Sequence, residues 1–251
     1  MMVSEPKLKR AVELIREIGV LLETAPPWGY ALETDFSVGE RRTRADRNDG
    51  AADDVALRIG DCVQNLRASL DHAWTRKVLD HVPEKKQRAV QFPFCEAQAD
   101  LSKSIAARMP AYENNNLTAA IEGLKPFRGG NVALWTVHEL GIPDRHMCLL
   151  PLGDFKRVSS AALMRLIPDF PTGLIDCGFG QSQYDVVWNG PKLNRKQRRA
   201  RGGLSSVEVQ RLDLPVDAVF GSGSLMGLPI VAALEMMAEA TSIAVEVVND
   251  A

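Results

Sequence analysis

The sequence has few cysteines and little net charge. Its 251 residues contain four cysteines, with no CxxC pair and no regular spacing: Cys62, Cys95, Cys148 and Cys177. This excludes a regular disulfide framework, and we expect buried, reduced thiols in a cytoplasmic protein. A formal net charge of −2 excludes a global field that would attract nucleic acid or a membrane, so any anion binding must be local.

Membrane and metal signals are also missing. No run of 18 or more apolar residues exists, and the first 24 residues alternate charged with apolar residues instead of forming a secretory signal. His72, His138 and His146 could supply metal ligands together with a carboxylate, but no HxxxH, HxH or HxxE spacing occurs. We therefore expect no membrane contact, no metal and no cofactor.

Helical periodicity is strongest at the two ends and in the centre of the chain. Apolar residues recur every three or four positions from Ser4 to Pro26, from Asp53 or Asp54 to about Asp80, and from Ile230 to Asn249. Three shorter helices are predicted over Asp100–Arg108, over Leu117–Leu124 with Asn116 as the cap, and over Val132–Leu140 with Asn131 as the cap.

Short apolar runs between turn residues predict strands. Trp28–Phe36 and Glu40–Arg47 are expected to form a hairpin, and Val90–Phe94 an edge strand or an extended loop. The other predicted strands all lie in the second half: Met147–Leu152, Ala161–Leu166, Leu174–Phe179, Tyr184–Trp188, Val207–Leu212 and Val216–Phe220. The prediction is one α+β domain over residues 1–251. Its first, central and last helices form a bundle packed with an antiparallel sheet drawn mainly from the second half.

Polar residues crowd two turns of the central helix. Arg67 could hold a phosphate and His72 could move a proton, with Asn65 and Asp71 orienting them. The alternative is a polar helix flank in which Arg67 and Asp71 form a surface ion pair worth about 0.3–0.5 kcal/mol. Helix geometry places Arg67 about 140° from His72, so a shared site needs a second helix or a second subunit.

A second polar group lies about seventy residues later, around a predicted helix end and turn. It comprises His138, Glu139, Asp144, Arg145 and His146. A histidine in the last turn of a helix is also favoured by the helix dipole alone, which is the alternative for His138. We expect the two groups to form one site, built from Asn65, Arg67, Asp71, His72, Glu139, Asp144 and His146.

The segment Lys192–Arg201 is strongly basic and is predicted to be a hairpin loop. Such a run can bind RNA phosphates, and the residues that would do so are Lys192, Arg195, Lys196, Arg198, Arg199 and Arg201. No aromatic residue is interleaved, so base stacking is not indicated. The alternative is a solvated, flexible loop.

The two polar groups resemble the conserved blocks of a widespread family of bacterial and phage proteins of unassigned function. Asn65–His72 is similar to its NLR-x-x-LDH block, and His138–Leu140 with Asp144–His146 is similar to its EL…DKH block. Phe92–Phe94, Val186–Pro191 and the closing helix also fit its layout. The resemblance spans nearly the whole chain and supports the architecture more than an activity.

Arg67-x4-His72 on a helix also resembles, more distantly, the signature of HEPN-type ribonucleases. That resemblance implies RNA cleavage without metal, with arginine and histidine from two subunits meeting at a homodimer interface. Two hypotheses follow from the sequence. The first is a non-catalytic binding or scaffold protein with a buried Arg/Asp/His network. The alternative is a metal-independent ribonuclease in a toxin or phage-defence role.

Overall fold

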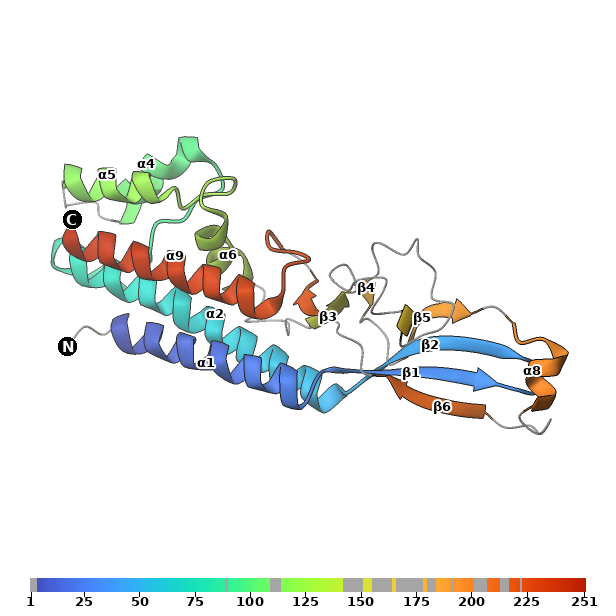
Figure 1. Ribbon diagram of the computed structural model, residues 1–251. Helices are drawn as coiled ribbons and strands as arrows, with labels where there is room; N and C mark the ends of the chain where they lie inside the picture. Colours follow the sequence, from blue (N-terminus) through green and yellow to red (C-terminus); the bar gives the residue numbers. More distant parts are fainter. Residues whose placement is uncertain are drawn as a thin grey trace. The chain divides into compact units, whose positions relative to one another are not determined.

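Figure 1 shows the computed structural model of the chain, which contains α-helices and antiparallel β-strands. The described residues are 4–88, 90–108, 114–141, 151–154, 164–165, 178–179, 184–190, 192–200, 207–212, 217–221 and 223–251. Within them, the helices are α1 (Ser4–Thr24), α2 (Asp49–Val78), α3 (Glu84–Gln87), α4 (Leu101–Arg108), α5 (Asn115–Leu124), α6 (Val132–Gly141), α8 (Arg195–Ala200) and α9 (Ile230–Asp250), with short 3-10 turns at Leu79–His81 and Gln98–Asp100.

The chain divides into two compact units, each assembled from separated segments. Unit 1 comprises residues 1–20, 56–149 and 222–251, and unit 2 comprises residues 21–55 and 150–221. Two of the four boundaries between the units fall within helices, one in α1 and one in α2. The α+β class is confirmed, whereas the single domain over residues 1–251 stays a prediction.

Three long helices form the core of unit 1 (Figure 1). The Cys62 thiol of α2 lies 3.6 Å from the carbonyl of Ala11 in α1, and Arg76 Nη2 of α2 donates to Asn249 Oδ1 of α9 at 2.6 Å. The predicted apolar faces of α2 and α9 are buried. On α2 they are Ile59, Cys62, Val63, Leu66, Leu70, Ala73 and Trp74, and on α9 they include Ile230, Leu234, Met237, Thr241 and Val248.

The start of α2 lies earlier than predicted. Asn48 accepts a hydrogen bond from the Ala51 amide through Oδ1 at 3.3 Å, and Asp49 stands in the first turn. Both features favour a helix N-terminus, so the four residues before the predicted start at Asp53, Asp49–Ala52, are helical. Arg76 and Lys77 in the last turn complement the dipole at the other end.

The shorter helices of unit 1 begin at asparagine caps. Asn131 Oδ1 accepts from the Leu134 amide at 3.0 Å, as expected for α6. The cap of α5 is Asn114, which accepts from the Leu117 amide at 3.0 Å. The prediction of Asn116 was wrong because three asparagines in a row satisfy the same rule, and composition cannot choose among them.

The described residues of unit 2 form two antiparallel sheets, of four and three strands. The larger has the order β5-β2-β1-β6, and its strands are β1 (Trp28–Asp35), β2 (Glu40–Arg47), β5 (Tyr184–Gly190) and β6 (Val207–Leu212). The predicted hairpin is confirmed, with Trp28 opposite Arg47 and Asp35 opposite Glu40. The sheet thus takes two strands from each half of the sequence (Figure 1).

The smaller sheet comes entirely from the second half. It has the order β4-β3-β7, with strands β3 (Pro151–Asp154), β4 (Gly178–Phe179) and β7 (Asp217–Phe220). The predicted strand over Ala161–Leu166 is wrong at its two described residues, Met164 and Arg165, which are helical. Val90–Phe94 is extended without joining either sheet, so of the two predicted alternatives it is the loop.

Candidate functional site

Arg67 lies at the centre of the polar cluster on α2. It is only 7% exposed and is the one charged side chain among the buried residues that the structure describes. Its Nε donates to Asp71 Oδ2 at 3.2 Å, one turn along the same helix. The pair is therefore not the ordinary surface ion pair that was the alternative reading of the sequence.

The second partner of Arg67 is His138, in the last turn of α6. Arg67 Nη1 lies 2.6 Å from His138 Nδ1. Burial, followed by the charges of Arg67 and Arg108, lowers the pKa of His138 from 6.5 to about 4. The imidazole is therefore neutral at pH 7. Because its Nδ1 accepts from Arg67, its proton is on Nε2.

Aromatic rings enclose this arginine–histidine pair. The Phe94 ring stacks on His138 with centroids 4.8 Å apart and an interplanar angle of 7°, and Arg67 Cζ lies 4.5 Å from the Phe94 centroid. Trp135, one turn before His138, meets the imidazole edge-on with centroids 5.0 Å apart. A guanidinium over a ring is held by cation–π attraction as well as by dispersion.

Asp71 connects this cluster to the extended Val90–Phe94 segment. Its Oδ1 accepts from the Phe92 amide at 2.8 Å, while Oδ2 accepts from Arg67. Both carboxylate oxygens are thus bonded within the chain. Since Phe92 is fully buried, this bond satisfies a backbone amide that has no strand partner.

A second arginine approaches from α4. Arg108 Nη1 donates to the Ser104 carbonyl at 3.1 Å and to Ser104 Oγ at 2.6 Å, and Ser104 Oγ in turn donates to the Phe94 carbonyl at 3.0 Å. Burial lowers the pKa of Arg108, and the charge of Arg67 lowers it further. The network thus joins α2, α4, α6 and the segment between α3 and α4.

The structure brings together only some of the residues that the sequence assigned to one site. Arg67 and Asp71 are bonded, and they meet the second polar group through His138 rather than through Glu139. Glu139 Oε2 accepts from the Ser224 amide at 2.8 Å, and the expected approach of Glu139 to Arg67 stays a prediction. Asp144 and His146 lie outside the described residues.

In the described part of the chain, neither His72 nor Asn65 is bonded to Arg67, Asp71 or His138. Asn65 Nδ2 donates to the Asp61 carbonyl of its own helix at 2.7 Å. His72 is half-buried, and its Nδ1 is buried with no hydrogen-bond partner in the described part of the chain. The angle of about 140° between Arg67 and His72 on a helix explains why one neighbouring helix can reach the arginine but not the histidine.

Three residues of this network, His138, Phe94 and Arg108, were not among the predicted site residues. His138 had a signal, because Trp135 and His138 are three residues apart and so share one face of a predicted helix. Phe94 and Arg108 had no comparable sequence signal, because tertiary packing places the loop and the helix that carry them.

The basic segment is not the predicted hairpin loop. Asn194 Oδ1 accepts from the Lys196 and Gln197 amides at 3.0 and 2.9 Å, and Gln197 Oε1 accepts from the Asn194 amide at 2.8 Å. This reciprocal pattern is a capping box, and it starts the helix α8. An asparagine followed three residues later by a glutamine is a sequence pattern that predicts the start of a helix.

The six basic residues of this segment have different surroundings. Arg198 donates through Nε to the Phe36 carbonyl at 2.9 Å and through Nη2 to the Ser37 carbonyl, and Lys192 forms an ion pair with Glu40 at 3.0 Å. These two residues therefore bind the β1–β2 turn. Arg195, Lys196 and Arg199 are exposed. Arg201 lies outside the described residues.

Three further observations concern metal ligands, membrane-spanning helices and the Cys62 thiol in the described part of the chain. Among them, no group of three or more His, Cys, Asp and Glu side chains is placed to hold a metal ion. None of the helices in the described ranges is both long and apolar enough to cross a membrane. Burial raises the pKa of the Cys62 thiol to about 12, so this cysteine stays protonated and unreactive.

Comparison of the chain with protein-family models, with curated proteins and with solved structures gives no match.

Proposed function

We propose that the protein is a non-catalytic binding or scaffold protein, in which Arg67, Asp71 and His138 form a structural network. One observation carries this proposal. The Arg67 guanidinium is bonded through Nε to Asp71 and through Nη1 to His138, and it lies against the Phe94 ring. An arginine with these partners holds α2, α6 and the Phe92–Phe94 segment together.

The protonation states support the same role. Asp71 is bonded at both oxygens, and the neutral His138 uses Nδ1 to accept from Arg67. The basic nitrogen of His138 is already bonded to Arg67, and two donors from different segments hold the Asp71 carboxylate. Both groups therefore position parts of the fold, which favours a structural network.

RNA is a proposed partner of the exposed cations of α8. Arg195, Lys196 and Arg199 would contact phosphates, and no aromatic side chain accompanies them for base stacking. Such binding would be local, insensitive to base sequence and weakened by salt. We also propose that the protein is cytoplasmic.

A metal-independent HEPN-like ribonuclease, in a toxin or phage-defence role, is the second candidate function. It is favoured by His72, whose Nδ1 has no hydrogen-bond partner in the described part of the chain. His72 thus has a ring nitrogen that is not bonded within the described residues, and imidazole is a group suited to acid–base chemistry. In this proposal a homodimer would bring His72 of one subunit to Arg67 of the other, and Arg67 would leave His138 to stabilise the charge on the reacting phosphate.

An RNA-cleavage assay in EDTA tests the two candidates. Wild type is compared with Arg67→Ala, His72→Ala and the matched control His81→Ala, and thermal melting checks the folding of each. The scaffold proposal expects no cleavage by wild type, a large loss of stability in Arg67→Ala and a small one in His72→Ala. Cleavage that persists in EDTA and in His81→Ala, but is lost in folded His72→Ala, would overturn it and establish the ribonuclease.

A further inference from the structure

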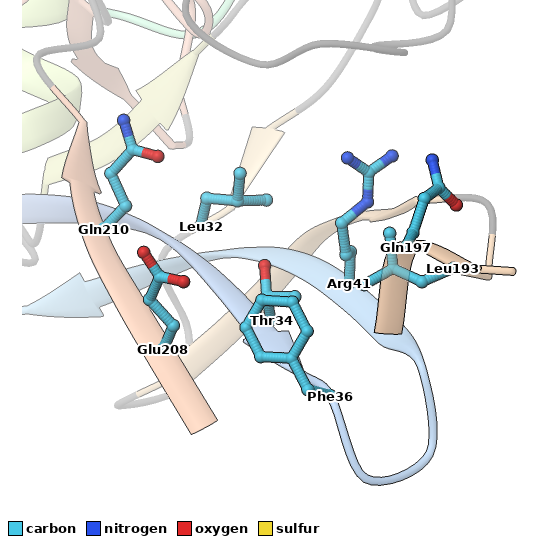
Figure 2. A pocket seen from close by; sticks show the side chains of 8 residues that line it. All are labelled: Leu32, Thr34, Phe36, Arg41, Leu193, Gln197, Glu208 and Gln210. Carbon is cyan, nitrogen blue, oxygen red and sulfur yellow. The ribbon is translucent and has the colours of Figure 1, made fainter. Parts of the chain in front are cut away.

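A pocket of about 340 Å³ lies on one face of the four-stranded sheet of unit 2 (Figure 2). Its walls combine apolar, amide, hydroxyl and charged side chains: Leu32, Thr34, Phe36, Arg41, Leu193, Gln197, Glu208 and Gln210. Its volume is at the small end of the range of about 300–1,000 Å³ found for ligand sites. The pocket is thus large enough for a small molecule.

The strand register arranges the charges across this pocket. Thr34 of β1 is opposite both Arg41 of β2 and Glu208 of β6, so the three side chains form one row on the same face. Neighbouring strands lie about 4.8 Å apart, which separates the Arg41 and Glu208 backbones by roughly 10 Å. Figure 2 shows these two side chains on opposite sides of Thr34.

The wall formed by Leu193 and Gln197 is fixed to the β1–β2 turn. The Leu193 amide donates to the Gly39 carbonyl at 2.7 Å, and the contacts of Arg198 with the turn hold the start of α8 in place. Gly39 has φ +75°, and a Cβ there would lie 3.0 Å from the Leu193 carbonyl oxygen. The turn accepts only glycine without strain, so the close approach of α8 is built into the sequence.

We infer that this pocket binds a small zwitterion, namely a free α-amino acid with an apolar side chain. Its carboxylate would bind the Arg41 guanidinium and its ammonium the Glu208 carboxylate, with Thr34 between them. Its side chain would lie over Leu32 and Phe36, of which Leu32 is buried in the floor of the pocket. A molecule with a single charge would contact only one of the two charged side chains.

This inference does not depend on the role proposed for Arg67. All residues that line the pocket belong to unit 2, whereas Arg67, Asp71 and His138 belong to unit 1. The two proposals can therefore fail separately, since one concerns RNA cleavage and stability and the other concerns amino-acid binding.

An NMR titration of the 15N-labelled full chain tests the inference. The probes are L-leucine and L-phenylalanine, compared with N-acetyl-L-leucine, which lacks the ammonium, and L-leucinamide, which lacks the carboxylate. We expect the amides of Thr34, Arg41 and Glu208 to shift with either amino acid. Each analogue should bind about tenfold more weakly or worse, because one charge-assisted contact is lost.

Variants assign the two contacts. Arg41→Gln and Glu208→Gln should each weaken leucine binding about tenfold. Arg42→Gln is the matched control, because Arg42 lies on the other face of β2 and bonds to Glu33, and it should leave binding unchanged. Glu208 is exposed, so Glu208→Gln carries the test if Arg41→Gln does not fold. No shift of the pocket amides up to about 10 mM ligand, equal binding of the analogues, or unchanged binding by Glu208→Gln would overturn the inference.

Discussion

The Arg67 network and the Arg41 pocket are both polar clusters, but they differ in what surrounds the polar groups. Around Arg67, donors and acceptors meet one another at 2.6–3.2 Å, and rings cover them. Around Arg41, charged and amide groups rise from one sheet face to line a pocket of about 340 Å³. In a closed cluster the polar groups bond to one another and stabilise the fold, whereas polar groups that line a pocket can also bind a ligand.

The largest effect that this comparison predicts is the loss of stability on removing Arg67. Arg67→Ala leaves Asp71 half-buried without its cation, and we expect the free energy of unfolding to fall by about 3–5 kcal/mol. Urea denaturation measures the change. The matched control is Arg42→Ala, which removes a half-exposed partner of Glu33 and should cost less than about 1 kcal/mol. Equal losses in the two variants would show that the buried Arg67 network contributes no more to stability than an exposed ion pair.

Arg198 should show an intermediate effect, because it binds backbone within unit 2. Arg198→Ala removes the hydrogen bonds to the Phe36 and Ser37 carbonyls, and we expect a loss of about 1–2 kcal/mol. Arg195→Ala, on the same helix but exposed, should change stability by less than about 0.5 kcal/mol. If Arg195→Ala were the more damaging change, α8 would not be attached to the turn through Arg198.

The pH dependence of stability isolates His138. Its pKa is about 4 in the folded chain and 6.5 as the ordinary value, so the unfolded state takes up its proton first. The stability contribution is therefore complete above about pH 6.5 and is lost as the pH falls toward 4. In His138→Gln, whose amide oxygen can still accept from Arg67, the decline between pH 6.5 and 4 should be shallower. Urea denaturation across this range gives the two slopes, and identical slopes would contradict a neutral His138.

The smallest effect on stability is expected at the pocket. Glu208 is exposed, so Glu208→Gln should change the free energy of unfolding by less than about 0.5 kcal/mol. Thermal melting without ligand measures this. A loss of more than about 1 kcal/mol would show that Glu208 serves the fold, as Arg67 does, and would remove the contrast between the two clusters.

Much of the fold was predictable because it depends on local patterns. The apolar stripes of α2 and α9 follow helical spacing, and their predicted faces are the buried ones. The β1–β2 hairpin and the Asn131 cap also follow short-range rules of alternation and hydrogen bonding. The prediction of a hairpin loop at the basic segment was wrong, although the capping box of Asn194 and Gln197 is also a local pattern.

The candidate site was less predictable, because its contacts join distant segments. The spacing of four residues predicts the ion pair between Arg67 and Asp71. The contact between the two polar groups was an expectation that did not depend on any local pattern. The choice of His138 over Glu139 depends on which side of α6 faces α2. A pattern on α6 alone does not decide this, since both residues lie in its last turn.

The long helices, their principal faces and the β1–β2 hairpin were readable from the sequence, because each results from interactions within a few residues. Tertiary structure alone decided that Arg67 is buried, that His138 is neutral and that Arg41 and Glu208 share a pocket. Burial, pKa and enclosure all depend on which distant surfaces exclude water, and one chain position does not carry that information.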